Sequence, residues 1–311
     1  MDNLTHSLFG AVLARAGLSQ RFGRGTTALL VVASNIPDID IVLALTHGDD
    51  AAWLRRTHSH SVLGGPILAV LLGVIAWRLS KGRIRLPVAC GLALLGVAGH
   101  VGLDLLNSYG VVVLYPFSGT RFELAWSFII DVAQWTILAA PLLLVRPLRR
   151  WITGVRLAQS ALMLYAAYIS ACAAGHARAV ALLDEHVASE RIHVEFRYVF
   201  PEALGPHRWR GVARDHDIWR MWLIDVVSGR VSGETEIRTA AFDPDVAALR
   251  ATPQGRRIEW FTKAPVWTVN ETRTQAHCTD LRFRSLVLTR RRDPFGWEFT
   301  LPGNQRVAPE P

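Results

Sequence analysis

Long apolar segments make up most of the first 180 residues, and shorter stretches of alternating polarity follow them. Five apolar segments come near the ~20 residues that a helix needs to cross a bilayer core. They span residues 26–45, 62–79, 87–106, 124–145 and 157–180. A sixth segment, Thr5–Leu18, is shorter and lacks the basic start and the small-residue cleavage site of a secretory signal, so we expect a short or half-inserted helix there. The pattern predicts an α-helical polytopic membrane domain over residues 1–180, with about five to six membrane helices.

The tail, residues 181–311, has a different pattern. Residues 191–200 alternate as a half-buried strand does, and residues 219–227 form a second such run that ends at a Ser228-Gly229 turn. Further strand-like stretches are 256–262 and 281–289. We therefore expect a small, mostly β C-terminal domain with its own core, in which the tryptophans pack inside. Because Cys278 is the one cysteine of the tail, a disulfide within that domain is excluded.

Within the first 180 residues of a chain whose net charge is +8, basic residues fall mainly in alternate loops. In chain order, with Thr5–Leu18 counted as the first segment, the loops after the first, third and fifth segments hold Arg and Lys and no acid, whereas loops 46–61 and 107–123 are balanced. Since cytoplasmic loops retain Lys and Arg, this predicts a multi-pass protein of the cell (inner) membrane whose N-terminus, balanced loops and C-terminal domain are extracytoplasmic. Topology thus accounts for the positive charge, and a nucleic-acid partner is not expected.

Eight ionisable side chains lie inside or beside the apolar segments, where such groups are costly unless they share a task. These candidate metal ligands are His6, Asp38, Asp40, His58, His60, His100, Asp104 and Asp131. On the predicted topology all of them converge on the outer leaflet. The sequence therefore predicts an outward-facing metal centre built into membrane helices.

Two pairs within this set have informative spacing. His100 and Asp104 are four residues apart, which places them on one helix face, either as ligands of one cation or as a buried hydrogen-bonded pair. Pro37 stands beside Asp38 and Asp40, which suggests a broken helix that lines a polar cavity.

Other members of the set have structural alternatives. His58 and His60 occupy alternate positions, so at most one of them needs to bind the metal. His6 is equally well explained as an exposed terminal residue. Asp131 alternatively pairs with Arg121 or caps a helix.

The ligand types indicate which metal and which chemistry to expect. Imidazole and carboxylate together favour zinc as the divalent metal, with manganese or iron as alternatives. Such a metal lowers the pKa of a bound water, and a second metal stabilises a leaving oxygen. The candidate catalytic residues are Asp40, Arg56 and Tyr109. Arg56, Tyr109 or Arg121 would contact an anionic head group or the developing charge, although the two arginines are alternatively interfacial anchors.

Several motifs occur in a fixed order along the chain. They are Met1–His6, Ile36–Asp40, Arg56–Ser61, Gly99–Asp104, Asn107–Gly110, Tyr115–Phe117 and Phe128–Asp131. On these motifs residues 1–145 resemble the YdjM-type membrane-bound metal-dependent hydrolases, also described as a domain of unknown function, and a weaker likeness continues at Arg208–Arg210 and Thr279–Phe283. The resemblance implies a multi-spanning membrane protein that hydrolyses its substrate with a bound metal. One departure is Arg55, where relatives place His, so a ligand is missing or His58 takes its role.

A more distant similarity concerns the order of the ligands. His6, an Asp from 38–40, His60, and then His100 with Asp104 follow the order found in zinc-dependent phospholipase C and the S1/P1 nucleases, which are multi-zinc phosphoesterases. Those enzymes add a later His-x-x-x-Glu pair, for which this chain offers only His186 and Glu190, whereas Asp131 is the more economical extra ligand.

These observations favour a membrane-bound metal-dependent hydrolase of phosphoesterase type. Its expected partner is a membrane lipid or lipid-linked phosphoester, because the ligands converge on one leaflet. The alternatives are a non-catalytic metal-binding protein, an ion-translocating protein, and a sensory protein whose tail binds a partner. Translocation requires polar residues that continue to the cytoplasmic side, and the inner halves of the predicted spans contain none. The sequence indicates no oligomeric state.

Overall fold

The computed structural model describes all residues except 24, 43–53, 149, 204, 289–294 and 302–311. The chain divides into two compact units, Met1–Ala173 and Ala174–Pro311. Each unit has its own buried apolar clusters. The last residues of the predicted span 26–45 lie outside the described residues.

The first unit is helical. Its elements are α1 (Asn3–Leu13), a π-helical turn (Ala14–Leu18), α2 (Ser19–Phe22), α3 (Gly25–Ala33), the 3-10 turn η2 (Ile36–Ile39), α6 (Gly64–Leu79), α7 (Leu86–Leu105), α8 (Val132–Leu148) and the first part of α9 (Gly154–Ser189). Asp2 begins α1 as its N-cap, since its carboxylate accepts the backbone N–H groups of Leu4 and Thr5. Pro37 is the second residue of η2, in the first turn, where it needs no backbone N–H.

Fewer helices are long enough to cross a membrane than the apolar pattern predicts. Two described helices, α7 and α9, have the length and composition for it, and a third is obtained if α3 and Ile36–Val42, bent by 51° relative to one another, count as one broken span. At 16 and 17 residues, α6 and α8 are apolar but shorter. The helical membrane character is thus found in the described residues, while the count of five to six spans is not confirmed.

The start of α8 explains part of this difference. Residues 124–131 are not helical, so the predicted segment 124–145 loses its first third. Asp131 precedes the helix, and its Oδ1 accepts the backbone N–H groups of Ala133 at 2.9 Å and Gln134 at 3.4 Å. A carboxylate at this position satisfies donors that a helix start leaves unpaired, so the helix begins there.

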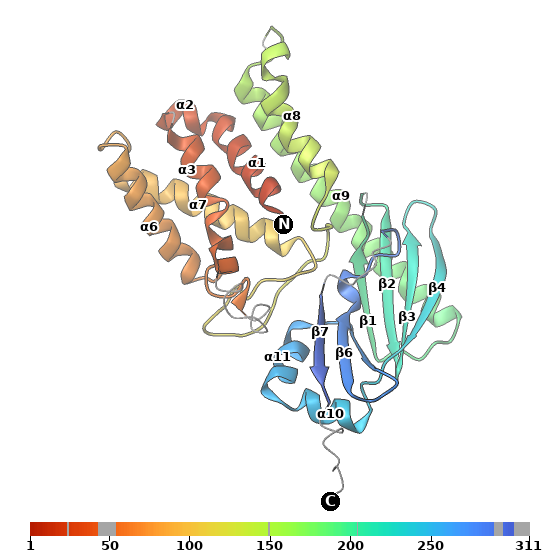
Figure 1. The fold of residues 1–311 in the computed structure, drawn as a ribbon. Coiled ribbons are helices and arrows are strands. Elements are labelled where there is room, and N and C mark those ends of the chain that lie inside the picture. The colour runs from red at the N-terminus through yellow and green to blue at the C-terminus, as the bar shows by residue number, and fades with distance from the viewer. Residues whose placement is uncertain (24, 43–53, 149, 204, 289–294, 302–311) are drawn as a thin grey trace, which may run out of the picture. The chain divides into compact units, whose positions relative to one another are not determined.

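Small residues let α1, α3 and α7 approach closely. A Cβ added at Gly96 of α7 would lie 2.5 Å from Ala33 Cβ of α3, and one at Gly10 of α1 would lie 2.8 Å from the Leu30 carbonyl oxygen of α3. Such contacts are typical of helix interfaces in membranes, where small residues let backbones pack together. Figure 1 shows these helices side by side. Three of the candidate ligands lie on them, His6 on α1 and His100 with Asp104 on α7.

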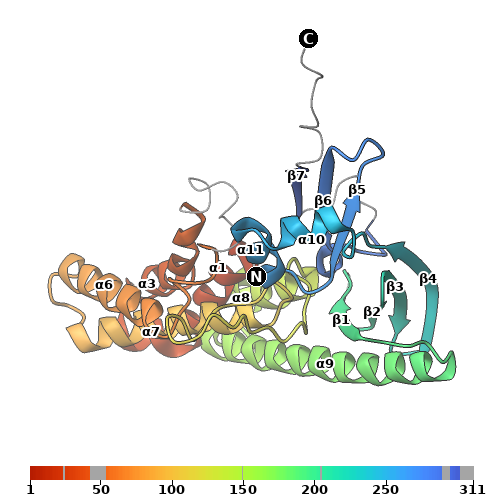
Figure 2. The same ribbon diagram turned by 90° about the horizontal axis from the view of Figure 1, so that it is seen from below.

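The second unit contains two antiparallel sheets. The first joins β1 (Phe196–Pro201), β2 (Arg208–Asp215), β3 (Ile218–Asp225) and β4 (Arg230–Arg238) in that order, and the second joins β5 (Pro265–Val269), β6 (Gln275–Asp280) and β7 (Gly296–Thr300). The C-terminal part of α9 runs along the first sheet (Figure 2), with Leu183 in a core that includes Trp209 and Trp222. The expected mostly β C-terminal part with buried tryptophans is therefore present.

Two of the predicted strands are wrong. Residues 256–262 fall largely in the helix α11 (Pro253–Phe261), which follows α10 (Pro244–Arg250). Thr252 caps α11, and Ile258 and Phe261, three residues apart, bury one face of the helix, so its period is helical. In 281–288 the chain forms only the 3-10 turn Leu281–Phe283, and residue 289 lies outside the described part.

Candidate metal centre

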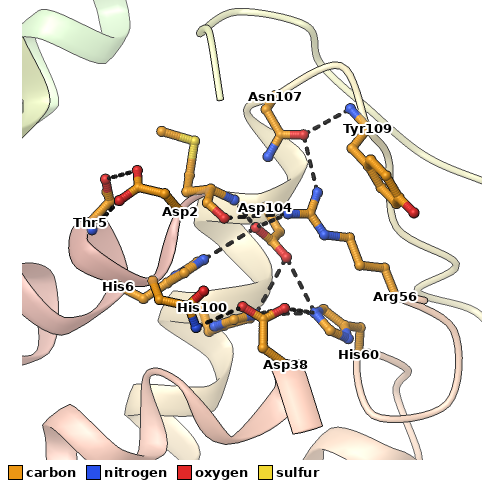
Figure 3. Close-up of polar contacts among 12 residues, drawn as sticks. Asp2, Thr5, His6, Asp38, Arg56, His60, His100, Asp104, Asn107 and Tyr109 are labelled. Atoms are coloured by element: carbon orange, nitrogen blue, oxygen red, sulfur yellow. Dashed lines mark hydrogen bonds and ion pairs between the residues drawn. The ribbon is translucent and has the colours of Figure 1, made fainter. Parts of the chain in front are cut away.

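Four of the predicted ligands converge in the first unit. Asp38 comes from η2, His60 from the irregular segment before α6, and His100 and Asp104 from α7. One ligand atom from each lies within 4.8 Å of all the others. Figure 3 shows the four side chains pointing toward one another. All four are buried, from Asp38 at 7% exposure to His100 and Asp104 at 0%.

The distances among these atoms resemble the edges of a tetrahedral zinc site. Zinc–ligand bonds of 2.0–2.1 Å place neighbouring ligand atoms about 3.3 Å apart. His60 Nε2 lies 3.0 Å from His100 Nε2 and 3.2 Å from Asp104 Oδ2, and the last two atoms are 3.3 Å apart. Asp38 Oδ1 is somewhat further out, at 3.9 Å from each imidazole Nε2. The donor set and its spacing fit a small divalent cation.

Hydrogen bonds to the far side of each imidazole fix which nitrogen carries the proton. His100 Nδ1 lies 2.8 Å from the Ser34 carbonyl oxygen, which only accepts, so this nitrogen is the N–H donor. His60 Nδ1 faces Asp40 Oδ2 at 3.3 Å and Ser59 Oγ at 3.0 Å, and the Ser59 hydroxyl itself donates to Asp40. In their neutral forms both rings therefore direct an Nε2 lone pair inward, at the 3.0 Å separation. Two such acceptors beside two carboxylates require a positive charge between them.

The local electrostatics agree with this requirement. Burial by itself lowers the pKa of His60, but its hydrogen bonds to Asp104 and Asp40 outweigh burial and raise that pKa. Part of the negative charge is offset by Arg56 Nη2, 2.9 Å from Asp104 Oδ1, and by Arg55 Nη2, 3.3 Å from Asp38 Oδ1. The centre thus favours a cation at the position that the imidazoles face.

The break after α3 brings Asp38 into the centre. The backbone bends by 51° between α3 and Ile36–Val42, at Ser34 and Asn35 just before Pro37, so the helix is broken here as the sequence pattern predicts. The segment with His60 is in turn tied to the loop after α7, because Val112 N–H donates to the Arg56 carbonyl and Val62 N–H to the Val113 carbonyl.

His6 is adjacent to the four-residue group. Its ring stacks on His100 with centroids 3.8 Å apart, and its Nε2 lies 3.3 Å from Asp104 Oδ1. The side chain is completely buried, and neither ring nitrogen makes a hydrogen bond within the described residues. The alternative of an exposed terminal residue does not apply.

The three predicted catalytic residues surround the group. Asp40 Oδ2 accepts the Arg56 backbone N–H at 2.6 Å and stands behind His60. The Arg56 guanidinium lies over the Tyr109 ring, 4.7 Å from its centroid, and donates to Asn107 Oδ1 at 3.1 Å (Figure 3). Asp40 therefore orients a ligand, while Arg56 bridges Asp104 and the ring.

Two predicted ligands are not brought into the group. His58 is exposed and makes an edge contact with the Tyr115 ring, with centroids 4.6 Å apart. Asp131 caps α8 and accepts the Tyr168 hydroxyl at 2.6 Å. Of the two histidines at alternate positions, His60 is the one that faces the centre. For Asp131 the structure places the side chain as the helix-capping alternative describes.

Some residues around the centre were not identified from sequence. Arg55 contacts Asp38, although the pattern pointed only to a missing histidine at that position. Asn107 holds both Arg56 and the Tyr109 backbone N–H, and its place within the Asn107–Gly110 motif was the available signal. Ser34 acts through its backbone carbonyl, which leaves no trace in the sequence.

Comparisons with known proteins give one match. A family model described as YdjM inner membrane protein matches residues 1–179, a range that includes every residue of the centre. Neither the curated proteins nor the solved structures contain a match to the chain.

Proposed function

Starting from the fact that the chain belongs to the YdjM inner membrane protein family, we propose that it is a membrane-bound metal-dependent hydrolase. The proposed substrate is a lipid or lipid-linked phosphoester close to the membrane surface. The centre would face outward, and the C-terminal unit would be extracytoplasmic, as the charge of the loops indicates.

A single observation carries the proposal: the inward-facing pair of imidazole nitrogens, 3.0 Å apart, flanked by two buried carboxylates. A buried pair of acceptors with nearby carboxylates is costly unless a cation joins them. Mixed nitrogen and oxygen ligands favour zinc, with manganese or iron as alternatives. We propose Asp38, His60, His100 and Asp104 as the ligands, with His6 extending the set through Asp104.

The residues around the ligands have distinct proposed roles. A divalent cation bound there supplies Lewis acidity, which polarises an ester and makes water more acidic. Asp40 keeps the His60 proton on Nδ1, so that Nε2 stays available as a ligand. Arg56, held by Asn107 and by the Tyr109 ring, balances the charge of Asp104 and would steady negative charge that develops on the substrate.

The competing function is a metal-binding protein without turnover. It is tested with the full chain purified in detergent, loaded with zinc or manganese, and offered phospholipids, polyprenyl phosphates and a generic phosphodiester. We expect hydrolysis that depends on the metal, is lost in His100→Ala, and is retained in Arg85→Gln, whose exposed side chain lies at the other end of α7. Bound metal without hydrolysis of any of these substrates would refute the hydrolase and favour a binding or sensory role.

A further inference from the structure

We infer that Arg55 is the residue that recognises the substrate, by binding the oxygens of an anionic phosphoryl group at the entrance to the metal centre. The inference rests on the proposed function, because it assigns a substrate class to the same centre. It predicts that phosphoesters carrying negative charge are preferred over neutral carboxylic esters.

The first support is exposure. The side chains of the four proposed ligands are between 0% and 8% exposed, and that of Arg56 is 5% exposed. The Arg55 side chain is 27% exposed, while its Nη2 lies 3.3 Å from Asp38 Oδ1. Among these charged groups it is therefore the one that both touches a proposed ligand and reaches solvent, which is where a substrate must enter.

The second support is the way Arg55 is held. The Arg121 guanidinium donates to the Arg55 carbonyl at 3.1 Å and to the Gly110 carbonyl at 2.9 Å, which fixes the Arg55 backbone. The Arg55 guanidinium carbon lies 5.9 Å from the centroid of the Tyr109 ring. A guanidinium placed in this way is pre-organised for a planar, two-point contact with an oxyanion.

The third support is unused hydrogen-bonding capacity. Arg55 Nε is buried and makes no hydrogen bond within the described residues, and its distance to Asp40 Oδ1 is 4.0 Å. The Arg56 guanidinium contacts Asp104, Asn107 and the Met1 carbonyl through its Nη atoms, and its Nε likewise makes no hydrogen bond among the described residues. The Arg56 side chain is only 5% exposed, so Arg55 is the arginine whose unpaired donor belongs to a side chain that reaches solvent.

The fourth support is the charge balance. Arg55 and Arg56 together offset two of the three carboxylates Asp38, Asp40 and Asp104. A divalent cation would then give this set of groups a net positive charge, and the charge that remains unmatched is that of the partly exposed Arg55, which an anion would neutralise. A phosphoryl group meets this need, and a neutral ester does not.

The test measures binding of inorganic phosphate to the zinc-loaded full chain by titration calorimetry, with zinc content determined in every sample. Arg55→Gln removes the charge and the fork of donors, and Arg55→Lys keeps the charge alone. Arg85→Gln is the matched control, because Arg85 is exposed and stands 15 residues before His100, about 22 Å along α7. We expect about a tenfold or greater loss of phosphate affinity in Arg55→Gln, a smaller loss in Arg55→Lys, and none in the control, with zinc retained throughout.

Several results would overturn the inference. They are unchanged phosphate affinity in Arg55→Gln, absence of phosphate binding to the zinc-loaded wild type, and loss of zinc from both Arg55 variants, which would make Arg55 a support of the metal instead. The outcome is separable from that of the proposed function. Phosphate binding that depends on Arg55 in a protein that hydrolyses no phosphoester would uphold the inference and refute the hydrolase.

Discussion

Replacing Asp40 by Asn tests whether this carboxylate orients His60 for the metal. Three donors converge on Asp40 Oδ2: the Arg56 backbone N–H at 2.6 Å, the Ser59 hydroxyl at 3.2 Å and His60 Nδ1 at 3.3 Å. An Asn side-chain oxygen can occupy the same place, so the variant removes the charge while these three donors keep an acceptor. Alanine would instead bury three unsatisfied donors and disturb the fold.

The expected size of the effect follows from the position of Asp40 behind a ligand. Loss of such a partner weakens metal binding about 10- to 100-fold, or by about 1.4–2.7 kcal/mol. Competition with a fluorescent zinc chelator measures the affinity of the full chain. Asp280→Asn is the control, because Asp280 has the same 2% exposure and also accepts backbone N–H groups, but lies in the second unit. Wild-type zinc affinity in Asp40→Asn, or an equal loss in Asp280→Asn, would refute the reasoning.

Three further predictions concern other parts of the chain. His60→Ala should lose metal while His58→Ala retains it, as measured by elemental analysis of both proteins, and equal metal content would mean that the wrong histidine has been assigned. Gly96→Val should lower the midpoint of thermal unfolding, because its Cβ would lie 2.5 Å from Ala33 Cβ. Gly91→Val is the control, since no atom lies within 4 Å of a Cβ there, and it should change the midpoint much less. Similar midpoints for the two variants would contradict the close packing of α3 and α7. Burial raises the pKa of the Cys278 thiol well above its ordinary value, so maleimide labelling of Cys278 near neutral pH should be slow until the protein is denatured. Labelling as fast as that of a small free thiol would show that Cys278 is not buried in the core of the second unit.

The helical centre was largely predictable because its residues break the apolar pattern. Buried His and Asp side chains are expensive in such segments, so the sequence singles them out, and the four-residue spacing of His100 and Asp104 fixes their common face. Outside regular helices, the apolar pattern does not show which way a side chain points. His58 and His60 differ by two positions in an irregular segment, and only the hydrogen bonds of that segment decide that His60 turns inward.

The misassigned strands have a different origin. Residues 256–262 contain aromatic and β-branched residues that suit a strand, but the Thr252 cap and the Pro253 that follows it start a helix whose face buries Ile258 and Phe261. The length of α8 was overestimated for a similar reason. The apolar run includes residues 124–131, which are not helical. Hydropathy alone does not show that Asp131, at the end of these residues, caps α8 and so marks where the helix begins.

The most direct test of a metal centre is the metal content of the purified full chain, determined by elemental mass spectrometry for the wild type, Asp38→Ala and His100→Ala. We predict at least one equivalent of a divalent metal in the wild type and its loss in both variants, since each removes a ligand atom from the same group. Metal-free wild-type protein after reconstitution with zinc, manganese and iron would contradict the account.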